Sequence, residues 1–368
     1  MKTILRKTAF FIALISIAIT ACSFGTYAED AAKFEPFIRI DRDDAEAYDR
    51  GLENLRIITG SMYEFKELDE KYGIPSDYIP DETGLDALDV SASAQFNDWQ
   101  FAELADQLSE VASEKKIVIF DLRRKSHALL NGRPFSIYAQ HNWSNAGFST
   151  EEIMRDEAQF FSSLEKTTIE AHPKKGDGPG EAYDYEIERF QTEKELVESE
   201  GLNYFRLPSM DHCWPEPECV DQFINMIKET GIDNLWLHIH CHAGKSRTGS
   251  FLVMYDKMKN PDVPIKEIAI RQAMLGSSYM LNTERNSDGW KAPLYEEKAR
   301  MTYLFEDYIN ETKDTNYELP WSEWLEGHEL EDAAWEHEIS LNESSHTGLC
   351  WLHGTAFSGI PKTKLREQ

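Results

Sequence analysis

One stretch of this chain, from Leu235 to Phe251, constrains the fold more than any other, because it joins three local structures within a few residues. It reads LWLHIHCHAGKSRTGSF. The first six residues are an apolar run with β-branched and aromatic side chains, which predicts a buried strand. Residues 248–258 are good helix formers and end before an Asn-Pro pair, which predicts a helix. The chain must therefore turn sharply at residues 241–247.

This turn has the composition of an anion site built around a reactive thiol. Cys241 and Arg247 are spaced as Cys-x5-Arg, with Gly244 between them. A glycine-containing turn at a helix start points backbone N–H groups inward and adds partial positive charge, which suits phosphate. A thiol there, beside a guanidinium, has a lowered pKa, so Cys241 is expected to be a nucleophilic thiolate. Arg247 can hold two phosphate oxygens, and the Thr248 hydroxyl can donate to the thiolate when it leaves.

Other interpretations of the same stretch fit the sequence less well. A buried cysteine on a strand is usually inert core, but here an arginine and a Thr-Gly pair follow it. Three histidines share one face of the predicted strand, as metal ligands would: His238, His240 and His242. Cys241 would point the other way, and no distant Cys-x2-Cys completes a zinc site. Gly244-Lys245-Ser246 resembles the end of a nucleotide P-loop, but Ile239 stands where its first glycine must be. We therefore expect no metal at this turn.

The net charge of −28 excludes one class of partner. Nonspecific binding to nucleic acid needs a basic face, so nucleic acid is not an expected partner. An acidic protein that binds phosphate must also gather its cations locally, because its long-range field repels the substrate. The run Arg123-Arg124-Lys125 supplies such cations, although a solvated charge run is an equally good interpretation of Arg124 and Lys125.

The N-terminus predicts export. Three cations precede an apolar run at residues 9–20, which is too short to span a bilayer and is typical of a secretory signal. Two cleavage sites compete: the sequence ending at Cys22 resembles a bacterial lipobox, and Thr26-Tyr27-Ala28 resembles an ordinary signal-peptidase site. We therefore expect a signal peptide at residues 1–28. The mature chain would be a periplasmic or cell-surface lipoprotein, meeting the membrane only through a lipid anchor at Cys22, or a secreted protein.

Export affects the remaining cysteines. In an oxidising compartment two of Cys213, Cys219 and Cys350 can pair, and the short loop between the first two makes a local bridge conceivable. The sequence leaves this pairing open. The same compartment would expose a catalytic thiolate to oxidation.

A second strand and an acid are expected beside the turn. Residues 116–123 read KIVIFDLR, a buried strand whose end would lie beside Cys241 in a parallel sheet. Expelling an alkoxide requires a proton donor. Asp211 is the best candidate, because it follows a predicted strand end and precedes an aromatic-proline hinge. Glu216 and Glu218 are rivals, although a helix N-terminus suits them as first-turn charges. Burial near a bound phosphate must raise the pKa of Asp211.

Further short segments support a specific resemblance. They are Asn54–Arg56, Val90–Phe96, Phe120–His127, Asn142–Asn145, Tyr204–Leu207, Asp211–Pro215, Arg271–Gln272 and Pro320–Trp324. Together with the Cys241 turn, they resemble, in the same order, the bacterial cysteine phytases, which are protein-tyrosine-phosphatase-like inositol polyphosphatases. The resemblance implies an α/β fold with a parallel or mixed sheet flanked by helices, and a small partial β-barrel insertion. We place the phosphatase domain at 51–325 and the insertion at 167–190, between an acidic arm at 29–50 and an acidic, polar tail at 326–368.

The resemblance also implies a mechanism without metal or cofactor, through a cysteinyl-phosphate intermediate. It makes Cys241 the nucleophile, Arg247 the phosphate clamp and Asp211 the general acid, with Thr248 assisting the thiolate. Substrate contacts are expected from the loop and from four residues elsewhere: His242, Ala243, Gly244, Lys245, Ser246, Arg56, Asp121, His127 and Gln272.

Two departures from the family pattern bear on the substrate. Family members carry several lysines in the segment matching 279–291, and this chain has few cations there. Lys245, by contrast, lies inside the loop where many members have an apolar residue, and it resembles the loop of tensin-type phosphoinositide phosphatases. We expect hydrolysis of inositol polyphosphates. The alternatives are a protein tyrosine or dual-specificity phosphatase acting on phosphopeptides, an inactive phosphate-binding module, and a rhodanese-like sulfur transferase, which would need neither Asp211 nor the Thr248 hydroxyl.

Overall fold

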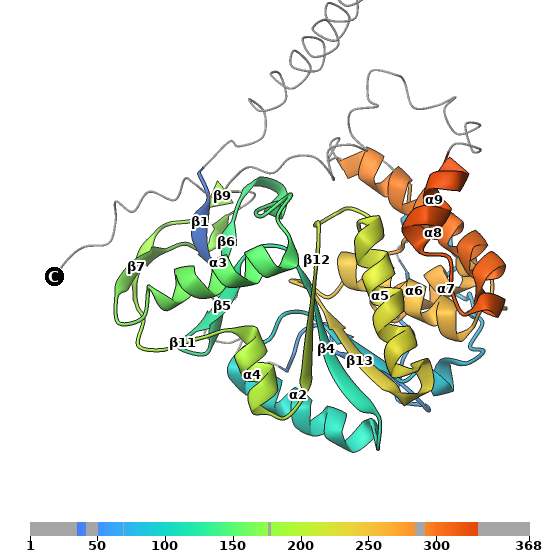
Figure 1. Cartoon of the computed structure of the whole chain (residues 1–368), viewed down its shortest axis with the longest axis horizontal. Helices are drawn as coiled ribbons and strands as arrows, with labels where there is room; N and C mark the ends of the chain where they lie inside the picture. The colour runs from blue at the N-terminus through green and yellow to red at the C-terminus, as the bar shows by residue number, and fades with distance from the viewer. Residues whose placement is uncertain (1–34, 42–50, 69, 176–177, 284–290, 330–368) are drawn as a thin grey trace, which may run out of the picture.

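The computed structural model describes residues 35–41, 51–68, 70–175, 178–283 and 291–329. Figure 1 shows a larger α/β part joined to a smaller part made of strands and one helix. The predicted signal peptide and the tail from residue 330 onward lie outside the described residues. Within the described ranges, no helix is both long enough and apolar enough to cross a membrane.

A five-stranded sheet forms the centre of the larger part. Its order is β12 (Asn203–Ser209), β4 (Lys116–Arg123), β13 (Leu235–His240), β3 (Val90–Ser93) and β2 (Arg56–Ile58). The first four strands are parallel, and β2 pairs antiparallel with β3. The predicted strands at 116–123 and 235–240 are therefore neighbours, and their carboxyl ends lie at the same edge of the sheet.

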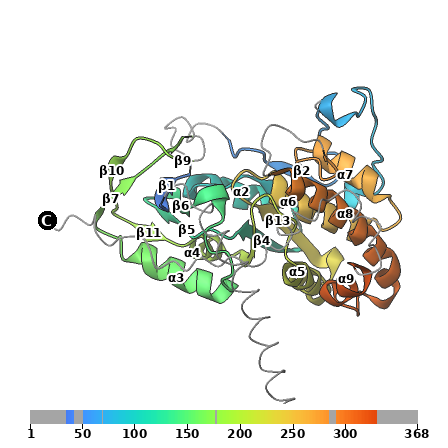
Figure 2. The ribbon, with the colours of Figure 1, turned by 90° about the horizontal axis from the view of Figure 1, so that it is seen from above.

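Helices cover both faces of this sheet (Figures 1 and 2). One face packs on the helices α5 (Pro217–Thr230), α6 (Ser246–Lys259), α8 (Ala292–Thr312) and α9 (Trp321–Glu329), and the other on α2 (Asp98–Val111) and α4 (Glu193–Ser199). Side chains alternate as expected for strands buried on both sides. Leu235, Leu237 and Ile239 enter the first core, whereas Trp236 enters the second. The helix α7 (Ile265–Met274) packs on α6 through a smaller core.

The smaller part is an open, mostly antiparallel unit. One sheet has the order β1 (Phe37–Ile40), β6 (Arg133–Tyr138), β5 (His127–Leu130) and β11 (Phe190–Gln191). Two further pairs are formed by β7 (Thr168–Ala171) with β10 (Tyr183–Glu186), and by β8 (Lys174–Lys175) with β9 (Gly178–Pro179). The helix α3 (Thr150–Ser162) packs against these strands. The described strands do not close into a barrel.

This unit extends beyond the segment at 167–190 that the sequence suggested. Its central strands β5 and β6 precede α3, and its first strand comes from the predicted acidic arm. For residues 37–40 the arm prediction was wrong, because Phe37, Arg39 and Ile40 are buried and pair with β6. Four residues are too few to show a strand period among acidic neighbours.

Local sequence signals explain several helix starts. The helices α2, α3 and α4 each begin with a capping box, in which the N-cap side chain and the N3 side chain satisfy each other's backbone N–H groups. The pairs are Asn97 with Gln100, Ser149 with Glu152, and Thr192 with Glu195. The helix α6 has no such cap, which leaves its first N–H groups available to a ligand.

Candidate active site

The turn between β13 and α6 forms a loop in which four consecutive carbonyl groups accept hydrogen bonds from other segments. Four donors reach four consecutive carbonyl oxygens: Gln95 N–H to His242 at 3.2 Å, Asn54 Nδ2 to Ala243 at 2.8 Å, Arg56 Nη2 to Gly244 at 3.0 Å, and Ser278 N–H to Lys245 at 3.2 Å. Because these carbonyl groups are held from outside, we infer that the N–H groups of the loop face the space above Cys241. Such a ring of amides binds tetrahedral anions.

Cys241 lies at the base of this loop. It is buried, and burial alone would raise the pKa of its thiol. The Arg247 guanidinium and the Thr248 hydroxyl act in the opposite sense and leave the pKa of Cys241 below its ordinary value. Arg247 is also buried and sits in the first turn of α6. The structure therefore brings together the three loop residues that the sequence singled out.

Asp211 joins them from the loop between β12 and α5. Its Oδ1 lies 3.1 Å from Arg247 Nε. Burial would raise the pKa of this carboxyl, but Arg247, His212 and a hydrogen bond from Asn142 hold it well below its usual range. The carboxylate is thus ionised and paired with the arginine of the loop.

The two rival acids lie elsewhere. Glu216 is the N-cap residue of α5 and forms a buried ion pair with Arg124, with 2.6 Å between Oε1 and Nη2. Glu218 is an exposed residue in the first turn of the same helix. Glu218 thus has the first-turn position that the sequence suggested, whereas Glu216 lies just before the first turn and is paired with Arg124. Of the three carboxylates, Asp211 is the one that contacts Arg247.

Arg56 supports the loop from below. Its guanidinium donates to the carbonyls of Asn54 and Gly244 at 3.0 Å each and to Ser277 Oγ at 3.1 Å. Burial lowers the pKa of Arg56 to about 10, although the Cys241 thiolate opposes the shift. Arg56 therefore remains a cation beside the anion site, where one of these three hydrogen bonds joins it to the loop itself.

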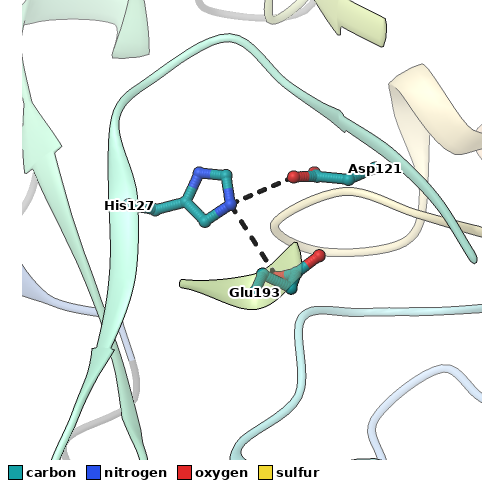
Figure 3. Close-up of side chains that lie close together, drawn as sticks. All are labelled: Asp121, His127 and Glu193. Carbon is teal, nitrogen blue, oxygen red and sulfur yellow. Dashed lines mark ion pairs between the residues drawn. The ribbon is translucent and has the colours of Figure 1, made fainter. Parts of the chain in front are cut away.

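Asp121 and His127 were expected to contact substrate, but the structure buries both within an ion-pair network, at 0% and 2% exposure. His127 Nε2 lies 3.0 Å from Asp121 Oδ2 and 3.8 Å from Glu193 Oε2 (Figure 3). Arg123 bonds both carboxylates, and Arg206 reaches His127 at 3.3 Å. These contacts join β4, β5, β12 and α4, so the network fastens the two parts of the molecule together.

Asp121, His127 and Glu193 have the spacing of metal ligands, because their possible donor atoms all lie within 4.8 Å of one another. The arginines already neutralise the carboxylates, so a divalent cation would have to displace them. We therefore assign the cluster a structural role. Gln272 was also expected near substrate, yet it is fully buried and donates to Asp256 Oδ2 at 2.8 Å.

Lys298 is a site residue that the sequence reasoning missed. It comes from α8, is almost fully buried, and donates to Ser246 Oγ at 2.9 Å. Burial lowers the pKa of Lys298 to about 8, against the opposing effect of Asp211. Lys245, by contrast, is exposed on the loop. A lysine within an amphipathic helix carries no signal of its own in sequence, because such residues usually face water.

The cysteine pairing is partly resolved. Cys219 and Cys241 are free, whereas Cys213 takes part in a disulfide. The local bridge between Cys213 and Cys219 is therefore not formed. Cys350 lies outside the described residues.

A Cys-x5-Arg loop between a central parallel strand and a helix, with an aspartate facing the arginine, defines a protein of the tyrosine phosphatase superfamily. Comparisons with known proteins narrow this class. The model of the family PTPlike_phytase, whose description is "Inositol hexakisphosphate", matches residues 120–259 of this chain. The chain belongs to the family of protein-tyrosine-phosphatase-like phytases.

Solved structures from two bacteria agree with the family model. A PTP-like myo-inositol phosphatase from Mitsuokella multacida, in complex with myo-inositol-(1,3,4,5)-tetrakisphosphate, is 31% identical with a TM-score of 0.73. That match covers 84% of this chain and 52% of the Mitsuokella chain. A PTP-like phytase from Bdellovibrio bacteriovorus is 27% identical with a TM-score of 0.59, over 80% of this chain and 96% of its own.

A curated relative is also similar in sequence. The effector protein hopD2 of Pseudomonas syringae pv. tomato is 27% identical over 214 residues, or 56% of this chain. The chain spans about half the length of each of these two relatives, 46% of hopD2 and 52% of the Mitsuokella protein.

Proposed function

We propose that this chain is a cysteine-dependent phosphatase that hydrolyses phosphomonoesters of inositol polyphosphates. The observation that carries the proposal is the convergence of Cys241, Arg247 and Asp211 on one amide-lined loop. Membership in the phytase family, and a relative whose structure holds an inositol tetrakisphosphate, support this substrate class.

The geometry suggests a two-step reaction. The Cys241 thiolate attacks phosphorus, the bond to the bridging oxygen breaks, and Asp211 gives its proton to the departing alkoxide. Arg247 and the loop amides hold the non-bridging oxygens as charge develops on them. Asp211 then takes a proton from water, which attacks the phosphocysteine. The sulfur leaves as a thiolate stabilised by Thr248, and inorganic phosphate is released.

Local cations favour a substrate with more than one phosphate. Lys245 is exposed on the loop, and Lys298 lies against it through Ser246. The phosphate bound above Cys241 would use the amides and Arg247, so these two lysines remain for neighbouring phosphates of the same ring. In a protein with net charge −28, such a local cluster is needed to attract a polyanion.

The deciding experiment compares phosphate release from phytate and from a phosphotyrosine peptide, for wild type and Cys241→Ser. We expect faster release from phytate, abolished in the variant. A clear preference for the peptide would favour the alternative, a protein tyrosine or dual-specificity phosphatase. If wild type and Cys241→Ser released phosphate equally, the protein would be an inactive phosphate-binding module and not an enzyme.

We also propose that the chain is exported, as a periplasmic or cell-surface lipoprotein or as a secreted protein. The N-terminal pattern supports this, and so does the disulfide at Cys213, because such bonds are typical of oxidising compartments. Mass spectrometry of the mature N-terminus decides between the two cleavage sites. A lipid-bearing Cys22 would support the lipobox, and an unmodified start at residue 29 would support ordinary signal peptidase.

A further inference from the structure

Two side chains from the smaller part of the molecule hold Asp211. Asn142 Nδ2 donates to Asp211 Oδ2 at 2.8 Å, and Trp143 Nε1 donates to the Asp211 carbonyl oxygen at 2.8 Å. The first bond fixes the carboxylate, and the second fixes the backbone from which it projects. Both donors lie in the loop between β6 and α3, and they precede Asp211 in the chain by 69 and 68 residues.

This loop is itself fixed in position. His141, Asn142 and Asn145 have φ values of 58°, 65° and 65°, a left-handed conformation that is uncommon for non-glycine residues but that Asn and His adopt more readily than most. Asn145 Nδ2 donates to the Arg124 carbonyl at 3.1 Å and to Ser126 Oγ at 2.8 Å. The conformation thus places Asn142 and Trp143 against Asp211 at a cost that the neighbouring hydrogen bonds offset.

The buried guanidinium of Arg124 joins the loop between β6 and α3 to both ends of the loop between β12 and α5, which carries Asp211. Arg124 Nη1 donates to the carbonyls of Asn145 and Phe148, at 3.2 and 3.1 Å. Its Nη2 donates to the carbonyl of Pro208 at 3.3 Å and to Glu216 Oε1 at 2.6 Å. Because Pro208 and Glu216 flank Asp211, Arg124 holds the two loops as one unit.

One further hydrogen bond reaches the Asp211 carboxylate, because the backbone N–H of His212 donates to Oδ1 at 3.2 Å. The remaining groups that face Asp211 act mainly through their charge. Arg247 Nε lies 3.1 Å from Oδ1, and His212 Nε2 lies 4.0 Å from Oδ2. Lys298, His242 and Cys241 also act on this carboxyl electrostatically. A phosphate bound above the thiol recruits Arg247. The hydrogen bonds from the His212 N–H, within the same loop, and from Asn142 and Trp143, in the smaller part of the molecule, then remain to determine where the acid points.

Asn142 has a second feature that suits this task. It is 6% exposed, and among the described residues its Oδ1 has no hydrogen-bond partner. An amide offers a donor at one end and an acceptor at the other. The orphaned oxygen can therefore accept the proton of a neutral carboxylic acid, once the amide turns over.

We propose that Asn142 and Trp143 are positioning residues for the general acid, Asn142 by donating to the carboxylate and accepting from the protonated form, and Trp143 by anchoring the backbone. The inference rests on the proposed phosphatase function. It assigns a role in the reaction to the smaller β-rich part of the molecule.

The test uses two substrates that differ in their need for an acid. An inositol phosphate releases an alkoxide and needs the proton, whereas p-nitrophenyl phosphate releases a stable phenolate without one. The variants are Asn142→Leu and Trp143→Phe. The matched controls are Asn203→Leu, an exposed residue whose amide bonds the Ile117 carbonyl, and Trp99→Phe, whose side chain is 49% exposed on α2.

We expect Asn142→Leu to lower kcat on the inositol phosphate by about 10- to 100-fold, the effect of losing a hydrogen bond to a charged group, and to change kcat on p-nitrophenyl phosphate far less. Trp143→Phe should show the same selectivity more weakly, and the controls should match wild type. In an Asp211→Asn background, Asn142→Leu should cost nothing further, because the acid it serves is gone. Equal losses on both substrates, or additive losses in the double variant, would overturn the proposal.

A second measurement does not depend on turnover. Carbon-13 NMR of the free protein follows the titration of Asp211, and removal of the Asn142 donor should raise the pKa of that carboxyl, since the donor stabilises the ionised form. An unchanged titration would overturn the role of Asn142 even in a protein that hydrolyses neither substrate. Absence of turnover in wild type, with the titration shifted as expected, would refute the phosphatase function and leave the positioning contact standing.

Discussion

Gly244 offers the sharpest test of the loop, because the structure separates two costs of replacing it. Its φ is +66°, and a Cβ there would lie 2.3 Å from the Ser93 carbonyl oxygen and 2.6 Å from the Ala94 nitrogen. Ordinary contacts begin at about 3.4 Å, so the loop would have to move by about 1 Å. Gly201 has a similar φ of +74° but nothing within 4 Å of its Cβ position, which makes Gly201→Ala the matched control.

Both alanine variants bear the left-handed backbone cost of about 1–2 kcal/mol. Only Gly244→Ala adds overpacking, a further cost of about 1–3 kcal/mol, and the displacement of Cys241 from its amides. A misplacement of about 1 Å in a reacting group lowers the rate by roughly 10²-fold. We therefore expect Gly244→Ala to lose at least that factor in kcat/KM on p-nitrophenyl phosphate, and Gly201→Ala to lose only stability in urea unfolding. Near-normal activity of Gly244→Ala would refute the account of the loop.

Three further predictions concern charge. Since the pKa of Cys241 lies below its ordinary value, iodoacetate should inactivate the enzyme with a rate that saturates at a lower pH than for a free thiol, and a midpoint near about 8.5 would contradict this. Lys298 has a pKa of about 8 and loses its charge above it, so affinity for inositol polyphosphates should fall as the pH rises through about 8 in wild type, measured by calorimetry with Cys241→Ser as background. The fall should vanish in Lys298→Met, and its persistence there would assign the effect to another group. Asp256→Asn should lower the free energy of unfolding by about 3–5 kcal/mol, because it leaves the buried Arg271 cation unpaired; denaturant titration measures this, and a loss below about 1 kcal/mol would contradict it.

The parts of the site that follow from local sequence could be predicted. Cys241 and Arg247 lie on one turn, so their spacing along the chain fixes their spacing in space. Asp211 lies 30 residues earlier, just after the strand β12. Because β12 and β13 both pair in parallel with β4, their carboxyl ends place Asp211 at the same sheet edge. In both cases a strand that can be predicted from its apolar residues ends just before the functional residues.

Long-range ion pairs could not be predicted in the same way. Asp121 lies near the end of β4, and His127 begins the next strand, β5. Because β4 ends at the active-site edge, a substrate contact was a reasonable prediction for both. Their side chains instead meet Arg206, from β12, and Glu193, from α4. Charges buried in pairs carry no periodic signal, and their partners are set by tertiary packing that spacing along the chain does not reveal.

The ion pair between Asp211 and Arg247 couples phosphate binding to the protonation of Asp211. In the free protein the carboxylate occupies the arginine that a phosphate would bind, so the site presents a partly neutralised cation. A phosphate dianion competes for that guanidinium with two oxygens in a fork geometry, which a single carboxylate contact does not match. Once displaced, Asp211 faces a dianion instead of a cation, and its pKa must rise toward the protonated form that the reaction needs. Substrate binding therefore favours the protonated form of Asp211. A ligand too weakly charged to break the ion pair between Asp211 and Arg247 would leave Asp211 ionised and the alkoxide without a proton donor.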